Sequence, residues 1–290
     1  MEDYVIRGIN RSFRVFGANT TQLVSQLATR HATTPVATAA LGRTLTAATI
    51  MGQMSKNSED RISILIKGDG PIGGIVVEAN GRGNAKGYVY NPDVDIEKNA
   101  KGKLNVAGAI GNAIMTVSKD IGLKEPYIGQ TAMLSGEIAE DIADYFMISE
   151  QVNSVVILGV LVNPDDYTVK ASGGIIIQVL PDAQEEDIDK LESKITEFSS
   201  LTECLEKGQS IEEVINTLLE DVTILSKIDV KFNCDCSKDK MERALISLGK
   251  KELTDIVQDD QPDLELVCHF CNEKYQFDKK AIKDVVDTII

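Results

Sequence analysis

The spacing of the cysteines restricts the fold of this chain more than any other feature of its sequence. Four of the five cysteines form two close pairs, Cys234 with Cys236 and Cys268 with Cys271, and 31 residues separate the pairs. Two thiol pairs separated by about thirty residues of helix and turn can converge on one tetrahedral metal ion. The spacing therefore predicts a small zinc domain at this end of the chain, with one Zn²⁺ bound by four thiolates.

The region that carries these thiols is too short to rely on apolar packing alone. Within residues 232–290 we expect helices over 238–248 and 250–257, a hairpin over 268–277, and a last helix that begins at Asp278. A unit of roughly sixty residues lies near the lower limit for a self-supporting core. The metal is expected to supply much of its folding energy, on the order of 10 kcal/mol.

A purely structural zinc ion is the ordinary role of a four-cysteine site. Here each pair is close enough in sequence to close on itself as a disulfide, which would eject the metal. The ring closed by the Cys-x-Cys pair would be strained and therefore readily reduced. The spacing favours a reversible, redox-responsive site. His269 lies between two ligands, but four sulfurs already fill the site, so we expect it to be a neighbour of the metal and not a ligand.

The charge of the chain excludes several classes of partner. The net charge is −15, and residues 183–290 carry 26 acidic and 14 basic residues, against 19 and 16 in residues 1–182. This excess of acid opposes binding to nucleic acid and to anionic lipid, so neither nucleic acid nor membrane is an expected partner. The longest apolar run, 155–162, is too short to span a bilayer, and no targeting segment is recognisable. An odd number of cysteines argues against a secreted disulfide framework, so we expect a cytoplasmic protein.

Residues 1–181 show the pattern of an α+β domain with an antiparallel sheet and helices. After a strand over 4–9, helices are expected over 20–31 and 35–54, and Thr34 is the expected N-cap of the second. From residue 61 onward, β-branched runs alternate with glycine turns, which predicts a meander. Further strands are expected at 113–117, 131–134, 155–162 and 174–180, and one helix at 137–152. Few helices lie between the strands, which disfavours a parallel doubly wound sheet.

Residues 182–231 are expected to form an acidic helical linker between the N-terminal domain (1–181) and the zinc-binding domain (232–290). Residues 184–221 contain 12 acidic residues and three lysines, and a capping box of Ser210 and Glu213 starts a second helix. The first helix carries an apolar stripe: Ile188, Leu191, Ile195, Phe198, Leu201 and Leu205. Burial of this stripe must offset the repulsion between the acids, so the helices depend on their neighbours. They form either an ordinary packed hairpin or a conditionally stable linker.

The sequence offers little support for catalysis. The glycine-rich segment 68–74 lacks the Gly-Lys-Ser/Thr ending of a phosphate loop, and the third glycine of 81–87 lies one place late for a dinucleotide fingerprint. His31 is the only histidine outside the cysteine region, so a catalytic triad in the N-terminal domain could form only around this residue. No catalytic residue is predicted, and Cys204 is expected to be a packed core thiol.

Two segments around the cysteines are specific enough to resemble a known family. Residues 232–237 (FNCDCS) and 268–277 (CHFCNEKYQF) resemble the zinc site of the bacterial redox-regulated heat-shock chaperones, also called the 33 kDa chaperonin family. Residues 68–71 (GDGP), 144–151 (DYFMISEQ) and 171–181 (ASGGIIIQVLP) are similar to stretches that recur in the same family. The resemblance covers most of the chain.

The resemblance implies an ATP-independent holdase that is not an enzyme and is idle when reduced and zinc-bound. It implies that oxidation joins Cys234 to Cys236 and Cys268 to Cys271, releases zinc, unfolds the C-terminal region and linker, and allows capture of unfolding or oxidatively damaged clients. It also implies a homodimer and transfer of clients to ATP-dependent refolding chaperones. Cys204 lies outside the family pattern. The family resemblance and the apolar stripe of the linker together predict four residues that are buried in the idle state and bind clients after zinc loss. We call them the latch residues: Ile188, Leu191, Ile195 and Phe198.

Two other classes of protein would share the cysteines. A zinc-ribbon nucleic-acid-binding protein requires a basic face, which the acidic C-terminal part lacks, and a gel shift at low salt distinguishes it. A thiol oxidoreductase requires one exposed cysteine of low pKa, and turnover of a disulfide substrate distinguishes it.

Overall fold

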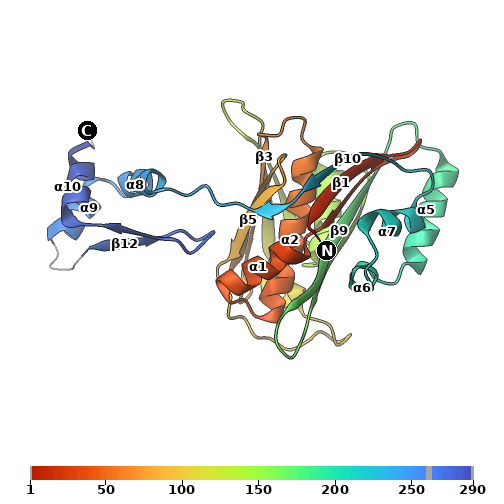
Figure 1. Ribbon diagram of the computed structural model, residues 1–290, viewed down its shortest axis with the longest axis horizontal. Helices are drawn as coiled ribbons and strands as arrows, with labels where there is room; N and C mark the ends of the chain where they lie inside the picture. The colour runs from red at the N-terminus through yellow and green to blue at the C-terminus, as the bar shows by residue number, and fades with distance from the viewer. Residues whose placement is uncertain (1, 259–262, 289–290) are drawn as a thin grey trace. The chain divides into compact units, whose positions relative to one another are not determined.

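The computed structural model describes residues 2–258 and 263–288, and its chain divides into two compact units (Figure 1). The first unit is Met1–Asn233 and the second is Cys234–Ile290. The predicted division into an N-terminal domain (1–181), a linker (182–231) and a zinc-binding domain (232–290) describes parts that fold and unfold separately. This division stays a prediction. Within the predicted last domain, residues 259–262 and 289–290 lie outside the described residues.

The first unit contains two sheets. The five-stranded sheet has the order β10 (Thr223–Asp229), β1 (Tyr4–Ile9), β2 (Phe13–Asn19), β9 (Val169–Val179) and β8 (Ser154–Val162). The six-stranded sheet has the order β11 (Lys231–Phe232), β5 (Asn84–Val89), β4 (Gly74–Asn80), β3 (Arg61–Gly68), β6 (Ala113–Asp120) and β7 (Tyr127–Met133). All neighbouring strands are antiparallel except β11, which pairs with β5 in parallel.

The helices of the first unit are α1 (Thr21–His31), α2 (Pro35–Met54), α3 (Val106–Ile110), α4 (Ile138–Ser149), α5 (Glu185–Glu197), α6 (Leu201–Glu206) and α7 (Ile211–Leu218). The expected α+β class is confirmed, although the strands form two sheets where one antiparallel sheet was expected. The helix predicted to follow Thr34 begins at Pro35, although the Thr34 hydroxyl donates to the carbonyl of Val94 at 2.5 Å and does not cap the helix. The predicted meander is β3, β4 and β5.

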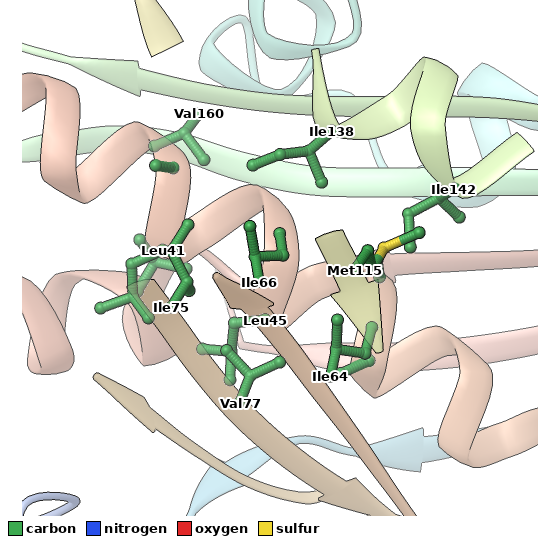
Figure 2. Close-up of a cluster of buried hydrophobic side chains, with 14 of the residues drawn as sticks. Leu41, Leu45, Ile64, Ile66, Ile75, Val77, Met115, Ile138, Ile142 and Val160 are labelled. Atoms are coloured by element: carbon green, nitrogen blue, oxygen red, sulfur yellow. The ribbon is translucent and has the colours of Figure 1, made fainter. Parts of the chain in front are cut away.

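Helix α2 lies between the two sheets and forms the centre of the main core (Figure 1). Its sequence is rich in alanine and threonine, and 17 of its 20 residues are buried, as a helix covered on all sides requires. Figure 2 shows Leu41 and Leu45 of α2 beside Ile75 and Val77 of β4, with Val160 of β8 near the same helix. The small residues of α2 allow both sheets to pack closely against it.

The linker region differs from its prediction in two respects. The helix predicted to continue to Leu205 ends before Phe198, whose backbone is extended, and Ser200 caps α6 by accepting a hydrogen bond from the Glu203 amide. In addition, the segment after α7 is a strand and not a helix. Strand β10 adds to the edge of the sheet, with Tyr4 opposite Asp229. The predicted capping box of Ser210 and Glu213 is present at the start of α7.

Helices α5, α6 and α7 cover the outer face of the five-stranded sheet (Figure 1). This second core joins residues of the sheet to residues of the three helices: Tyr4, Ile6, Phe13, Val15, Ala171, Ile175 and Ile177 with Leu191, Leu201, Leu205, Ile211, Val214, Ile215, Leu218 and Leu219. Gly17 permits the close approach of α7, because a Cβ at this position would lie 2.4 Å from Ile211 Cγ2. The Tyr4 hydroxyl accepts a hydrogen bond from the Ile211 amide at 3.1 Å and donates to Glu212 at 2.5 Å.

The second unit contains α8 (Lys238–Ile246), α9 (Lys250–Gln258), the hairpin of β12 (Leu264–Val267) and β13 (Lys274–Phe277), and α10 (Lys279–Thr288). As predicted, the last helix follows Asp278, whose carboxylate accepts a hydrogen bond from the Ala281 amide at 2.7 Å. The buried apolar side chains of this unit, within its described residues, are few: Leu245, Leu253, Phe277, Ile282 and Val285. A core of this size leaves the unit dependent on another source of folding energy.

Candidate metal centre

Four cysteine sulfurs converge in the second unit. Cys234 and Cys236 precede α8, and Cys268 and Cys271 lie in the loop between β12 and β13. All four Sγ atoms lie within 4.8 Å of one another, with 3.7 Å between Cys234 and Cys268 and 3.3 Å between Cys236 and Cys271. Tetrahedral Zn–S bonds of about 2.3 Å would place the sulfurs about 3.8 Å apart. The cluster therefore has the spacing of ligands to one ion.

Local backbone structure brings each pair into position. In the hairpin loop, the Cys268 amide donates to the Glu273 carbonyl at 2.9 Å, and the Asn272 amide donates to the Cys268 carbonyl at 2.7 Å. Asn272 adopts a left-handed conformation (φ 59°), which asparagine tolerates better than most residues. At the other pair, Ser237 follows Cys236 directly and caps α8 by accepting from the Lys240 amide. Each pair is thus held by a tight turn or a helix start.

The electrostatics of the cluster favour binding of a cation. Burial raises the pKa of Cys234 to about 11, and it is also the main cause of the raised pKa of Cys271. Burial also opposes ionisation of Cys236, but hydrogen bonds from Tyr275 and the neighbouring thiols outweigh it and lower the pKa of this thiol. Four thiolates this close repel one another strongly, and a divalent soft cation offsets that repulsion. The donor set fits a metal ion, and His269 is not among the groups that form it.

The other residues singled out from the sequence lie in the first unit. Leu191 is buried, 4% exposed, whereas Ile188, Ile195 and Phe198 are half-buried, and all four pack against the second core. Cys204 lies on α6 and packs half-buried against the same core. The four predicted latch residues therefore belong to the layer that covers the five-stranded sheet.

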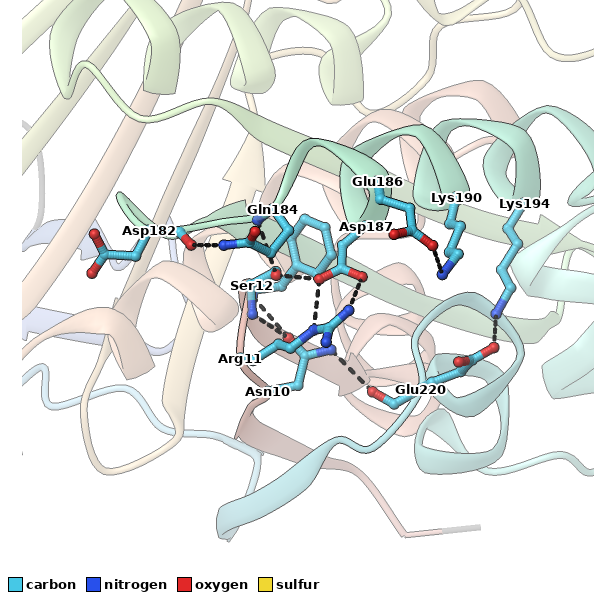
Figure 3. Close-up of polar contacts among 11 residues, drawn as sticks. Asn10, Arg11, Ser12, Asp182, Gln184, Glu186, Asp187, Lys190, Lys194 and Glu220 are labelled. Atoms are coloured by element: carbon cyan, nitrogen blue, oxygen red, sulfur yellow. Dashed lines mark hydrogen bonds and ion pairs between the residues drawn. The ribbon is translucent and has the colours of Figure 1, made fainter.

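Sequence reasoning missed a set of polar contacts that fixes the start of α5 (Figure 3). In the turn between β1 and β2, Arg11 donates two hydrogen bonds to the Asp187 carboxylate, at 2.9 Å and 2.6 Å, and the Ser12 hydroxyl donates a third. We call Arg11, Ser12 and Asp187 the polar clasp. The hydrogen bonds of the clasp lower the pKa of Asp187 to about 2, and the hydrogen bond from Arg11 has the largest effect. Because Arg11 and Asp187 lie 176 positions apart in the sequence, no local pattern signals the pair.

A second polar contact connects the β1–β2 turn to the segment after α7, the last of the three linker helices α5–α7. Asn10 donates to the Glu220 carbonyl at 3.0 Å, and Lys194 of α5 pairs with the Glu220 carboxylate at 3.5 Å (Figure 3). The β1–β2 turn thus contacts both the beginning of α5 and the segment after α7. The linker helices are held by polar contacts at this edge as well as by the second core.

These features define a class of protein: an α+β domain whose outer sheet face is covered by acidic helices, followed by a small unit with a four-cysteine cluster that could hold a metal ion. No helix among the described residues has both the length and the apolarity needed to cross a membrane.

Comparison with known proteins identifies the family. The family model described as Hsp33 protein matches residues 3–278. The 33 kDa chaperonin of Alkaliphilus oremlandii is 49% identical over 100% of this chain and 98% of its own length, and that of Lachnoclostridium phytofermentans is 47% identical over 99% of both. The crystal structure of the 33 kDa chaperonin (heat shock protein 33 homologue) from Thermotoga maritima matches with a TM-score of 0.89 and 32% identity, covering 99% of this chain and 98% of that one. The chain belongs to the Hsp33 family of chaperones, which confirms the resemblance found in its sequence.

Proposed function

We propose that this chaperone is an ATP-independent holdase controlled by the redox state of its metal centre. In the reduced, idle form, Cys234, Cys236, Cys268 and Cys271 bind one Zn²⁺ per chain. The observation that carries the proposal is the convergence of these four sulfurs within 4.8 Å, in a unit whose own apolar core is small. The bound ion supplies the folding energy that this core lacks.

Oxidation of the cysteine pairs removes the ligands. One thiolate attacks a peroxide oxygen, forms a sulfenic acid and releases hydroxide, and a second thiolate then displaces hydroxide to form the disulfide. Each disulfide takes two electrons from sulfur and reduces one peroxide. We assign the disulfides to Cys234 with Cys236 and to Cys268 with Cys271. The 3.3 Å between Cys236 and Cys271 makes pairing across the two segments the competing outcome.

Unfolding of the second unit would loosen the linker, because the strands that directly precede this unit in the chain would lose their fixed end. In chain order, β10 is followed by β11, which is a strand of only two residues, and then by Cys234. Fraying of these edge strands weakens the anchor of α7, which contacts β1 through Tyr4. Departure of α5, α6 and α7 would expose an apolar sheet face that includes Ile6, Val15 and Ile175, now fully buried. This face and the latch residues Ile188, Leu191, Ile195 and Phe198 form the proposed client-binding surface.

Membership of a chaperone family supports unfolded proteins as the partners of this surface. Burial of apolar client segments contributes about 25 cal/mol per Å² without nucleotide. In this proposal residues 1–181 stay folded, 182–231 act as the conditional linker, and 232–290 act as the sensor. We further propose that the active form is a cytoplasmic homodimer that passes clients to ATP-dependent chaperones. The chaperone family favours this function over the zinc-ribbon and oxidoreductase alternatives.

Native mass spectrometry tests the proposal. Protein prepared with reductant and zinc should carry one zinc ion per chain. After peroxide treatment it should carry none, and peptide mapping should find the two disulfides within the pairs. Zinc retained after full oxidation of the four thiols would overturn the switch, and disulfides between the pairs would overturn the assigned pairing.

A further inference from the structure

The side chain of Tyr275 contacts the metal centre without being one of its ligands. Its hydroxyl donates a hydrogen bond to Cys236 Sγ at 3.1 Å. Tyr275 lies on β13, opposite Leu266 of β12, and its ring packs against the apolar core of the second unit. Cys236 lies in the segment before α8. The hydrogen bond therefore joins the hairpin that carries one thiol pair to the segment that carries the other.

A hydrogen bond of this kind changes both the stability and the reactivity of a metal-bound sulfur. Four thiolates around Zn²⁺ leave a net charge of −2 on the centre, and the phenol O–H places a positive dipole against that charge. Groups that bind metal ligands in this way typically change metal affinity about 10- to 100-fold. The same hydrogen bond engages electron density on the sulfur that would otherwise attack an oxidant. Its loss should weaken zinc binding and speed oxidation.

We infer that Tyr275 is a positioning residue of the metal centre that shields Cys236 from oxidants and so raises the oxidant dose at which the chaperone becomes active. The inference rests on the proposed zinc switch and adds a residue to it. In the step concerned, Cys236 sulfur attacks a peroxide oxygen, the O–O bond breaks, and hydroxide leaves as the sulfenic acid forms. While Tyr275 donates to this sulfur, the attacking electron pair is less available.

The variant Tyr275→Phe removes the hydroxyl and keeps the ring that packs in the hairpin. Zinc-loaded wild type and Tyr275→Phe are treated with peroxide, and zinc release is followed with a chromogenic chelator. We expect release from the variant to be about three- to tenfold faster and its zinc affinity, measured by chelator competition, to be about tenfold weaker. Gln276→Ala is the matched control, because Gln276 is the next residue of β13 and donates to Glu265 at 2.6 Å, not to a cysteine. The control should behave as wild type.

Cobalt substitution separates an effect on sulfur from a general loosening of the hairpin. In the Co²⁺-loaded protein, loss of a hydrogen bond to a thiolate should move the sulfur-to-cobalt charge-transfer band to lower energy. A shift in Tyr275→Phe and none in Gln276→Ala supports the inference. Equal release rates and unshifted bands in zinc-binding wild type and Tyr275→Phe would overturn the inference alone. Wild type that binds no zinc would overturn the proposed function as well.

Discussion

Each cysteine of the proposed metal centre has a close sulfur neighbour, so the loss of one cysteine should weaken metal binding by the whole cluster. Cys268 is the most buried of the four, 5% exposed, and its sulfur lies 3.7 Å from that of Cys234. Cys268→Ser replaces a soft ligand with a hard one, and zinc affinity should fall at least about a hundredfold. Chelator competition measures this, and Cys204→Ser is the control that should keep wild-type affinity. Stoichiometric zinc of normal affinity in Cys268→Ser would rule out this site.

The polar clasp predicts that the stability of the folded state, in which α5 packs against the five-stranded sheet (the docked linker), depends on pH. The pKa of Asp187 is about 2 in the folded protein, against about 3.9 in an unfolded chain. A lowered pKa means that the ionised group stabilises the folded state above about pH 4 and that this stabilisation is lost as the pH falls towards 2. Asp187→Asn should therefore be less stable than wild type at pH 7, and the difference should shrink between pH 4 and 2.

Unfolding by denaturant at several pH values checks this prediction. Asp189→Asn is the matched control, since Asp189 is an exposed carboxylate of the same helix and is not part of the polar clasp. A constant difference between Asp187→Asn and wild type across the acid range would show that the carboxylate does not stabilise the docked helix.

At the level of elements, the proposed latch residues would connect packing of the linker helices against the sheet to chaperone activity. Phe198 directly follows α5 and packs half-buried against the second core. Phe198→Ser removes apolar contact worth about 1–2 kcal/mol and should favour the undocked linker. We expect chaperone activity to appear at lower peroxide concentration in this variant. Glu192→Ser, at an exposed position of the same helix, should leave the threshold unchanged. A Phe198→Ser protein with the wild-type threshold would show that this residue is not part of the latch.

Local signals in the sequence predict most elements of the fold, whereas contacts between distant segments are not visible in it. Pro35 at the start of its helix, the Ser210–Glu213 capping box and the glycine turns each act within a few residues, so the corresponding helices and strands were predictable. The convergence of the cysteines was also predictable, because metal geometry limits how two thiol pairs can be arranged. The pairing of β10 with β1 could not be predicted from local patterns, because Tyr4 and Asp229 lie 225 residues apart in the sequence.

The break between α5 and α6 illustrates a second limit. The apolar spacing continues across Phe198, so the pattern alone indicates one helix, and the cap at Ser200 decides otherwise. The polar clasp and the Tyr275 hydrogen bond are likewise tertiary contacts between residues that have no periodic relation. Local patterns identified the four cysteines that converge, whereas the residues around them required the three-dimensional arrangement.

At the scale of the whole molecule, oxidation should loosen one part of the chain and leave another folded. Helix α2 and the sheets around it form a core that contains no cysteine, whereas the linker helices depend on the second core. Hydrogen exchange should show loss of protection in α5–α7 and in residues 234–290 after peroxide treatment, with protection retained in α2, β3 and β9. Equal loss in both parts, or loss in neither, would contradict a conditional linker.

The charge distribution suits a protein that exposes apolar surface on demand. Residues 183–290 carry 26 acidic and 14 basic residues, so the segments proposed to open are also the most acidic. Once the linker leaves the sheet, these acids would surround the exposed apolar face and keep the client complex in solution. In the proposed switch, repulsion between these acids would also lower the free energy needed to open the linker after loss of the metal.

Light scattering of a heat-aggregating client tests the central claim most directly. The client is heated without nucleotide in the presence of this protein, prepared either reduced with zinc or treated with peroxide. The peroxide-treated protein should suppress aggregation at a near-stoichiometric ratio, the reduced protein should not, and reductant with zinc should restore the idle state. Equal suppression by both preparations, or none by the oxidised one, would contradict a chaperone controlled by its four-cysteine centre.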